Sequence, residues 1–334
     1  MPRSASRPAM PTIAGVADLA GVSRATVSRA FTRPEMLSEE TVRRVKEVAD
    51  EIGYRPNRAA RALSTGQHGN IALIVPDIAN PFFPPLIRAV QARADEAGLS
   101  VFLGDSDEDP AREDRLIGRF MPQVDGFVLA CPRLSQAAIQ AHARHRPIVL
   151  INRDIAGLSR ILIDSARGVV AAMRHLHGLG HRRIAYLGGP DVSWAQQQRD
   201  LAVRQSASEL GASIETLSLP RATFEAGFAS ADAIVASQAT AAIAFDDLVA
   251  EGLLIQLTER GIPVPDAFSI IGCDDALGPR TRPALTTISS PAREAGLESV
   301  EALMENLQYP ARRSSRRMME TALILRGSTA AAPS

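Results

Sequence analysis

The sequence predicts a small all-helical domain at the N-terminus, followed by a larger α/β region made of two doubly wound lobes. Two patterns along the chain predict this division. Up to residue 66, apolar residues recur at helical spacing between capping residues, whereas from Ile71 short apolar runs alternate with helical stretches. The 334 residues are enough for two or three domains, and the 46% hydrophobic and 22% charged content is that of a globular protein.

A helix, a short turn and a second helix are predicted near the N-terminus. Gly21 is placed to end the first helix in a left-handed conformation, and Ser23 is placed to cap the second. Val22 and Val27 flank this cap as a hydrophobic staple. The first helix has one apolar face, formed by Ile13, Val16, Ala17 and Ala20. Two helices joined by a three-residue turn that contains glycine make a helix-turn-helix.

The outer face of the second helix and the local charge both point to nucleic acid. That face carries residues able to bond phosphates and base edges, namely Arg24, Ala25, Thr26, Ser28 and Arg29. The alternative is an ordinary solvated helix face. Residues 1–66 hold 11 basic and 7 acidic side chains, a net charge of +4 in a chain whose total is zero. This asymmetry indicates a basic head on an acidic body.

A third helix and a short linker complete the N-terminal part. Ser38 is placed to cap the third helix, Gly53 to end it, and Pro56 then breaks the chain. Residues 57–66 have an N-cap, helix formers and a glycine stop but span only about two turns, so we expect them to be helical only when a partner holds them. The expected domains are a disordered tail (1–10), a helix-turn-helix domain (11–56), a hinge helix (57–67) and a core (68–330).

Seven apolar runs in the core read as strands separated by helices. They are Ile71–Val75, Val101–Leu103, Phe127–Ala130, Ile148–Ile151, Ile184–Leu187, Ala241–Phe245 and Phe268–Gly272. Alternating strands and helices predict parallel sheets in two lobes. The first lobe is expected at about 68–164 and 290–317, and the second at about 165–289 and 318–330. Because ligands bind beyond the carboxyl ends of parallel strands, we expect a site between the lobes.

Several protein classes are disfavoured by what the sequence lacks. The first ten residues hold no apolar run of signal-peptide length, and no segment is long enough to span a membrane. Cys131 and Cys273 lie in apolar stretches and are expected to be reduced thiols in a cytoplasmic protein. We see no dinucleotide-binding glycine motif, P-loop or catalytic triad, and therefore expect neither a cofactor nor an enzyme. The tail Ser328–Ser334 is expected to be disordered.

Two groups of polar residues imitate metal sites. They are His175, His177 and His181, and Asp105, Asp107 and Asp109. The first two histidines of the former group lie about 200° apart on a helix, so they do not face one ion. In the latter group Pro110 stands where a calcium loop needs glycine. We therefore expect no metal site.

Further motifs occur in collinear order along nearly the whole chain. In the N-terminal part they are Thr12-Ile13, Val16-Ala17, Leu19 to Arg29 and Tyr54 to Leu63. In the core they are Val75 to Phe83, Val124 to Gly126, Leu179 to Ala185, Gly272 to Asp275, Pro283 to Ile288 and Leu325 to Ser328. Taken together, these motifs make the chain resemble the lactose/galactose repressor (LacI/GalR) family.

The resemblance implies a homodimer in which each chain joins a helix-turn-helix head and a hinge helix to a core like the type I periplasmic sugar-binding proteins. Hinge helices of such proteins pair in the DNA minor groove, where Leu63 would wedge between base pairs. The alternatives are that Leu63 packs against its dimer mate and that Asn57 only caps the hinge. The chain stops soon after its last strand, without a tetramerising heptad tail. The expected DNA-binding residues are Thr12, Ser23, Arg24, Ala25, Thr26, Ser28, Arg29, Asn57, Ala60 and Leu63.

The resemblance also places effector contacts in the core. They fall on Phe82, Phe83, Asn152, Asp164, Trp194, Arg199, Asp246 and Asp274. Core packing is the alternative for the two phenylalanines. Trp194 with Arg199 suits a sugar ring, through stacking and bidentate hydrogen bonds. Asp246 departs from the family pattern because a carboxylate that only accepts replaces an amide, and this favours a donor-rich ligand such as a polyol over an anion.

These observations together predict a transcriptional repressor that binds double-stranded, pseudo-palindromic operator DNA. A small molecule, expected to be a sugar or polyol, would bind between the lobes, close them and unfold the hinges. Induction and corepression are equally compatible with the sequence. The alternative from another class is a solute-binding receptor for sugar transport, and the DNA-binding head and missing signal peptide argue against it.

Overall fold

The computed structural model describes residues 11–55, 67–311 and 314–333. The chain divides into two compact units, Met1–His68 and Gly69–Ser334. The expected tail 1–10 and all but the last residue of the expected hinge helix lie outside the described residues, and so do Asn57, Ala60 and Leu63. In the described part, none of the helices combines the length and apolarity needed to cross a bilayer.

The first unit contains the predicted helices. Its elements are α1 (Ile13–Ala20), α2 (Arg24–Thr32), a 3₁₀ turn η1 (Pro34–Met36) and α3 (Glu39–Glu51). The predicted caps are confirmed: Ser23 accepts from Thr26 N–H, Ser38 accepts from Thr41 N–H, and Gly21 ends α1 at φ 64°. The three α-helices share one small core built on Val16, Ala17, Ala20, Val27, Ala30, Val45, Ala49 and Tyr54.

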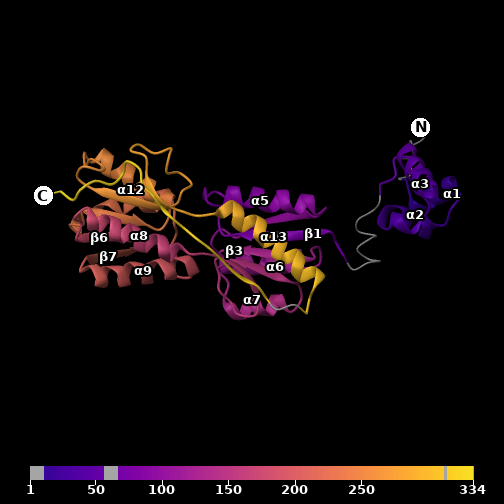
Figure 1. The fold of residues 1–334 in the computed structure, drawn as a ribbon, viewed down its shortest axis with the longest axis horizontal. Helices are drawn as coiled ribbons and strands as arrows, with labels where there is room; N and C mark the ends of the chain where they lie inside the picture. Colours follow the sequence, from indigo (N-terminus) through magenta and orange to yellow (C-terminus); the bar gives the residue numbers. More distant parts are fainter. Residues whose placement is uncertain (1–10, 56–66, 312–313, 334) are drawn as a thin grey trace, which may run out of the picture. The chain divides into compact units, whose positions relative to one another are not determined.

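The first lobe of the second unit is a parallel sheet in the order β11-β5-β4-β3-β1-β2. The strands are β1 (Asn70–Val75), β2 (Ser100–Asp105), β3 (Gly126–Ala130), β4 (Ile148–Ile151), β5 (Ser159–Ile163) and β11 (Arg316–Met319). The helices are α5 (Phe83–Glu96), α6 (Pro110–Phe120), α7 (Gln136–Ala143) and α13 (Ala292–Gln308). Helices α5 and α13 cover one face and α6 and α7 the other (Figure 1).

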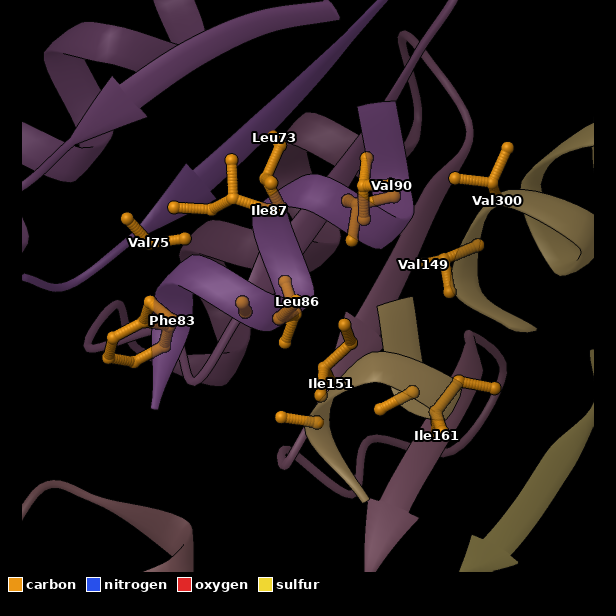
Figure 2. Close-up of a cluster of buried hydrophobic side chains, with 14 of the residues drawn as sticks. Leu73, Val75, Phe83, Leu86, Ile87, Val90, Val149, Ile151, Ile161 and Val300 are labelled. Carbon is orange, nitrogen blue, oxygen red and sulfur yellow. The ribbon is translucent and has the colours of Figure 1, made fainter. Parts of the chain in front are cut away.

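Close packing joins α5 and α13 to this sheet. Figure 2 shows side chains from α5, such as Leu86 and Val90, meeting strand residues and Val300 of α13 in one buried cluster. Gly296 permits the two helices to approach, because a Cβ there would lie 2.7 Å from the carbonyl oxygen of Leu86. This face of the sheet is therefore a rigid support for the loop that precedes α5.

The second lobe is a sheet in the order β12-β10-β9-β8-β6-β7, parallel except for the short edge strand β12. The strands are β6 (Arg183–Gly188), β7 (Ser213–Ser218), β8 (Ala241–Ala244), β9 (Ser269–Asp274), β10 (Thr286–Ser289) and β12 (Leu323–Ile324). The helices are α8 (Ser165–Gly178), α9 (Trp194–Leu210), α10 (Phe224–Ala229), α11 (Ala231–Ala236) and α12 (Asp247–Glu259). Helices α8 and α9 pack on one face, and α11 and α12 on the other.

The described chain passes between the lobes after Ile163, after Ser289 and after Met319. The last crossing lies two residues beyond the expected boundary at 317. The reason is that β11 pairs with β5 as far as Met319, opposite Ile163, so residues 318 and 319 belong to the first lobe.

The expectation of a disordered C-terminal tail is wrong for residues 328–332. Ser328 is fully buried, and its hydroxyl donates to the carbonyl of Ile270 and accepts from Thr286 N–H. Ala330 N–H donates to Ser269, and Ala332 N–H to the carbonyl of Leu179. Hydrogen bonds from the Ser328 hydroxyl and from backbone N–H groups, which composition does not reveal, hold this segment against the second lobe.

Candidate functional site: an exposed recognition helix and an interlobe pocket

The outward face of α2 is polar and basic, and its other face is buried. Val27 and Ala30 pack into the core of the first unit, whereas Arg24, Ala25, Ser28 and Arg29 are exposed. A short, accessible helix that follows a tight turn presents such residues to the edges of a DNA groove. The basic side chains at its two ends also suit phosphate oxygens.

Three other predicted DNA contacts have local structural roles. The hydroxyl of Ser23 accepts from Thr26 N–H at 3.0 Å and lies 2.9 Å from the Thr26 hydroxyl. Thr26 is half-buried. Thr12 accepts from Gly15 N–H at 3.2 Å. Thr12 is exposed and its hydroxyl proton is still free to be donated to a phosphate.

In the second unit, loops from both lobes converge on one small pocket. Its lining is Asn80, Phe82, Phe83, Glu108, Cys131, Arg133 and Asn152 from the first lobe, and Ser193, Ala195, Arg199, Ala222, Phe245, Asp246 and Asp274 from the second. The cavity measures about 40 Å³. Because one water needs roughly 10–15 Å³ by this measure, it has room for about three waters. The cavity in this arrangement of the lobes is therefore small.

The structure brings six of the eight expected effector residues together, namely Phe82, Phe83, Asn152, Arg199, Asp246 and Asp274. Asp164 and Trp194 are not part of the lining. The Asp164 carboxylate caps α8 by accepting from Arg167 N–H. Trp194 is the first residue of α9, and its neighbours Ser193 and Ala195 line the pocket instead.

Arg199 is the central cation on the second-lobe wall. It is 4% exposed, and its guanidinium donates to the Phe245 carbonyl and, at 3.3 Å, to Asp274. The guanidinium carbon also lies 4.7 Å from the centre of the Phe245 ring, a cation–π contact. Gly189 makes room for that ring, because a Cβ there would lie 2.6 Å from it. The buried Nε of Arg199 has no hydrogen-bond partner among the described residues.

Asp246 joins the two lobes across the pocket. One carboxylate oxygen caps α12 by accepting from Val249 N–H at 2.8 Å. The other accepts from the side-chain amide of Asn80, in the first lobe, at 2.9 Å. Burial raises the pKa of Asp246 to about 7, and the nearby Asp274 carboxylate adds to this effect. The group therefore titrates near neutral pH.

A second buried ion pair forms the first-lobe wall. Arg133 donates to Glu108 through Nε and, at 2.9 Å, through Nη2. Its Nη1 donates to the Cys131 carbonyl. Glu113 of α6 holds the same loop by accepting from the N–H groups of Arg133 and Leu134 at 2.7 and 3.1 Å. The bidentate geometry fixes Arg133 in place and leaves this wall without net charge.

Four residues of the lining have unusual backbone conformations. Glu108, Cys131, Asn152 and Asp274 have φ angles of 60°, 49°, 52° and 101°. Non-glycine residues rarely adopt positive φ, and each such residue costs on the order of 1–3 kcal/mol. All four follow strands β2, β3, β4 and β9 or end them. Strain concentrated at strand ends around one cavity is typical of a binding site.

Sequence reasoning did not assign Asn80, Glu108, Cys131, Arg133, Ser193, Ala195, Ala222 or Phe245 to the pocket. A usable signal existed for some of them, since Phe245 directly follows β8 and Cys131 directly follows β3. Applying the strand-end rule to every strand finds these two positions. Ser193 and Ala222 lie in connecting loops, where only the folded chain shows their direction.

The histidines of the second lobe hold the C-terminal segment. His175 hydrogen-bonds to Thr329 at 3.0 Å, and His181 bonds to Thr240 and to the Ala330 carbonyl at 2.8 and 3.1 Å. Burial lowers the pKa of both imidazoles. Within the described ranges, no cluster of three or more metal-ligating side chains is present.

Comparison with known proteins agrees with both parts of the site. Residues 12–57 match the model of the bacterial regulatory proteins of the lacI family, and residues 173–329 match a periplasmic binding protein-like domain. The chain is 33% identical over 331 residues to the transcriptional repressor CytR of Escherichia coli K12, covering 96% of this chain and 97% of CytR.

Solved structures extend the likeness to the whole fold. The Lac repressor dimer bound to operator and the anti-inducer ONPF matches with a TM-score of 0.87 at 25% identity, over 97% of this chain and all of that one. A LacI-family regulator from Enterococcus faecium with bound ribose matches with a TM-score of 0.72 at 27% identity, over 79% of this chain and all of that one. With its helix-turn-helix unit and two-lobed core, the chain belongs to the LacI family of bacterial transcriptional regulators.

Proposed function

We propose that the protein is a homodimeric transcriptional repressor that binds a pseudo-palindromic operator and is switched by a sugar or polyol in the interlobe pocket. The observation that carries this proposal is the presence, in one chain, of an exposed basic recognition helix and a polar pocket between two lobes. The operator-bound Lac repressor dimer and the ribose-bound regulator from Enterococcus faecium support the two halves of the proposal.

On the DNA side, α2 supplies the groups that read sequence. An exposed arginine such as Arg29 can donate two parallel hydrogen bonds to a guanine edge, and Ser28 can bond a base or a phosphate. Two copies related by twofold symmetry read two half-sites, which is why the operator is expected to be pseudo-palindromic. The linker residues Asn57, Ala60 and Leu63 remain proposed minor-groove contacts.

On the ligand side, the pocket connects a small molecule to the linker. The first lobe begins with β1 at Asn70, directly after the linker and Gly69, and it contributes half of the pocket lining. A ligand that favours one arrangement of the lobes therefore changes the position from which the linker departs. It switches operator affinity only to the extent that it binds the two arrangements with different affinities. The arrangement that it prefers decides between induction and corepression.

Replacing Arg29 with alanine tests the DNA-binding role. The operator is first isolated from a random duplex library with the full chain, and affinities are then measured by fluorescence anisotropy. Loss of a bidentate base contact should cost about 1–3 kcal/mol and relax selectivity at one base pair of each half-site.

Arg174→Ala is the matched control, because Arg174 is an exposed arginine on α8 of the core. This variant should bind the selected duplex as the wild type does. Recovery of no preferred sequence, or equal affinity of the Arg29 and Arg174 variants for the selected duplex, contradicts the proposed recognition role of α2.

A further inference from the structure

We infer that the interlobe pocket selects uncharged polyhydroxyl ligands over their carboxylate- or phosphate-bearing counterparts, and that Asp246 makes this distinction. The inference rests on the proposed function, because it takes this pocket to be the effector site. Beyond the proposed function, it specifies that the ligand is uncharged and that Asp246 discriminates against anionic ligands.

The charges of the pocket lining do not balance. Five charged side chains line it, the acids Glu108, Asp246 and Asp274 and the bases Arg133 and Arg199. Arg133 pairs with Glu108, and Arg199 pairs with Asp274 at 3.3 Å. Among the described residues, Asp246 is in no ion pair, and its oxygens accept only from Asn80 and from a backbone N–H.

An anionic ligand would be repelled by this unpaired carboxylate when it is ionised, that is, above about pH 7. Asp246 is 2% exposed, so little water screens its charge. Coulomb interactions between close charges in such an environment are several times stronger than in water. The two arginines do not offset the repulsion, because each is already bound to a carboxylate and a backbone carbonyl.

The hydrogen-bonding groups of the pocket are complementary to the hydroxyl groups of a ligand. The buried Nε of Arg199 lacks an acceptor among the described residues, whereas the ionised carboxylate of Asp246 can only accept. A hydroxyl both donates and accepts, so adjacent hydroxyls of one ligand can satisfy both walls. A carboxylate or phosphate only accepts at neutral pH, and an ammonium group only donates.

The present partner of Asp246 has the same chemistry as the inferred ligand. The Asn80 amide is an uncharged donor, and it reaches Asp246 from the opposite lobe. A ligand hydroxyl that takes over this bond replaces one neutral donor with another and leaves the charges of the pocket unchanged. Phe82 and Phe83, in edge-to-face contact at 5.0 Å between ring centres, supply an apolar wall for the C–H face of such a ligand.

The test compares neutral ligands with their anionic counterparts. At pH 8, where Asp246 is ionised, full-length protein is titrated with D-ribose, D-ribonate and D-ribose 5-phosphate, with D-glucose and D-glucuronate, and with cytidine and cytidine monophosphate. Thermal shift detects binding and calorimetry measures affinity. At least one neutral compound is expected to bind, with its anionic counterpart at least tenfold weaker. Asp246→Asn should narrow this ratio severalfold by removing the unpaired charge.

Asp109→Asn is the matched control, since Asp109 also caps a helix but does not line the pocket. It should leave the ratio unchanged. Anion binding as tight as that of the neutral partner overturns the inference, and so does a panel in which nothing binds. An unchanged ratio in a folded Asp246→Asn protein overturns the role of Asp246.

If Asp246→Asn does not fold, the wild-type ratios still decide the ligand class, and Asn80→Ala tests whether a neutral donor occupies the ligand position. Operator binding by the same preparation shows whether the proposed function survives.

Discussion

Asp246 has three tasks at one position. It caps α12, it bonds to Asn80 across the lobes, and it carries the unpaired charge of the pocket. Because burial raises its pKa to about 7, a small change in its surroundings alters its charge at physiological pH. The groups that face it are Arg199 and Asp274 of the second lobe and Asn80 of the first, with Glu108 and Arg133 in the same lining.

Binding of an uncharged ligand should therefore depend on pH. Adjacent hydroxyls of a ligand can donate more than one hydrogen bond to Asp246 in place of the single bond from Asn80, which favours the ionised carboxylate, so binding lowers the pKa of Asp246 and releases a proton below pH 7. Affinity is expected to rise by up to about tenfold per unit as the pH increases toward 7, and to level off above it. Calorimetric titration of the tightest neutral compound from the panel, between pH 5.5 and 8.5, measures this slope.

Asp246→Asn should abolish the slope, and ligand-free stability gives an independent check. The folded protein holds the Asp246 proton more tightly than the unfolded chain, whose ordinary pKa is 3.8. The stability that this residue contributes is thus fully present below pH 4 and is lost as the pH rises through 7. The melting temperature of Asp246→Asn should exceed that of the wild type by a larger margin at pH 8 than at pH 5. Equal differences at both values contradict the raised pKa.

The sequence identified those pocket residues that the resemblance to the LacI family places in the cleft. Arg199, Asp246 and Asp274 could be placed from family motifs, and all three line the cavity. Glu108 and Arg133 lie 25 positions apart, and nothing in either segment reveals that they pair. Trp194 was expected in the cleft because an indole near Arg199 suits a sugar ring, but this chemistry carries no information about the direction of a side chain at a helix start.

At the scale of elements, the sequence predicted helix starts well, whereas it did not predict most of the strands at the edges of the two sheets. Capping serines determined the starts of α2 and α3, because Ser23 and Ser38 each accept from a backbone N–H three residues along the chain. The strands that escaped prediction are β5, β7, β10, β11 and β12. Of these, β7, β11 and β12 are edge strands, and their sequences Ser213–Ser218 and Arg316–Met319 alternate or mix polar and apolar residues. Burial on one side only leaves a weak pattern.

The cap of α2 should control the stability of the recognition helix. Ser23→Ala removes the acceptor for Thr26 N–H and should destabilise α2 by about 1 kcal/mol. Hydrogen exchange of α2 amides in the full chain should accelerate correspondingly. Fluorescence of Trp194, the single tryptophan, reports on the core alone and should show unchanged unfolding.

Ser28→Ala is the comparison for this variant, because Ser28 is an exposed serine in the same helix and does not cap it. Exchange in α2 should stay at the wild-type rate. If both serine variants accelerate exchange equally, the cap is not what holds the start of the helix.

At the scale of the whole molecule, the two lobes of the core are held together by direct bonds as well as by chain crossings. Asn80 bonds to Asp246 in the pocket, and Arg153 donates to the Val192 carbonyl at 3.4 Å. Outside the pocket, Arg221 of the second lobe pairs with Asp107 of the first at 2.5 Å. Each of these two residues precedes a pocket residue, Ala222 and Glu108 respectively. The pair therefore resists separation of the walls that a ligand would touch.

Breaking the Asp107–Arg221 pair should strengthen ligand binding. Sequence reasoning expects a ligand to close the lobes, but a cavity of about 40 Å³ is far below the roughly 300 Å³ at which ligand pockets begin, so we expect the ligand-bound form to be wider. Arg221→Ala then selectively destabilises the narrow arrangement in which the pair forms. Both side chains are about half exposed, and the gain in affinity should be modest, about two- to fivefold.

The chain offers a matched control for this variant in Arg204, which pairs with Asp200 at 2.8 Å within α9 and makes no contact across the lobes. Arg204→Ala should leave affinity unchanged, and exchanging the charges, Asp107→Arg with Arg221→Asp, should restore the wild-type value. Small-angle scattering of ligand-free Arg221→Ala should show an expanded core. A fall in affinity would mean that the pair belongs to the ligand-bound arrangement, in which case the lobes close on the ligand and the pocket gains its volume through movement of Phe82 and Phe83.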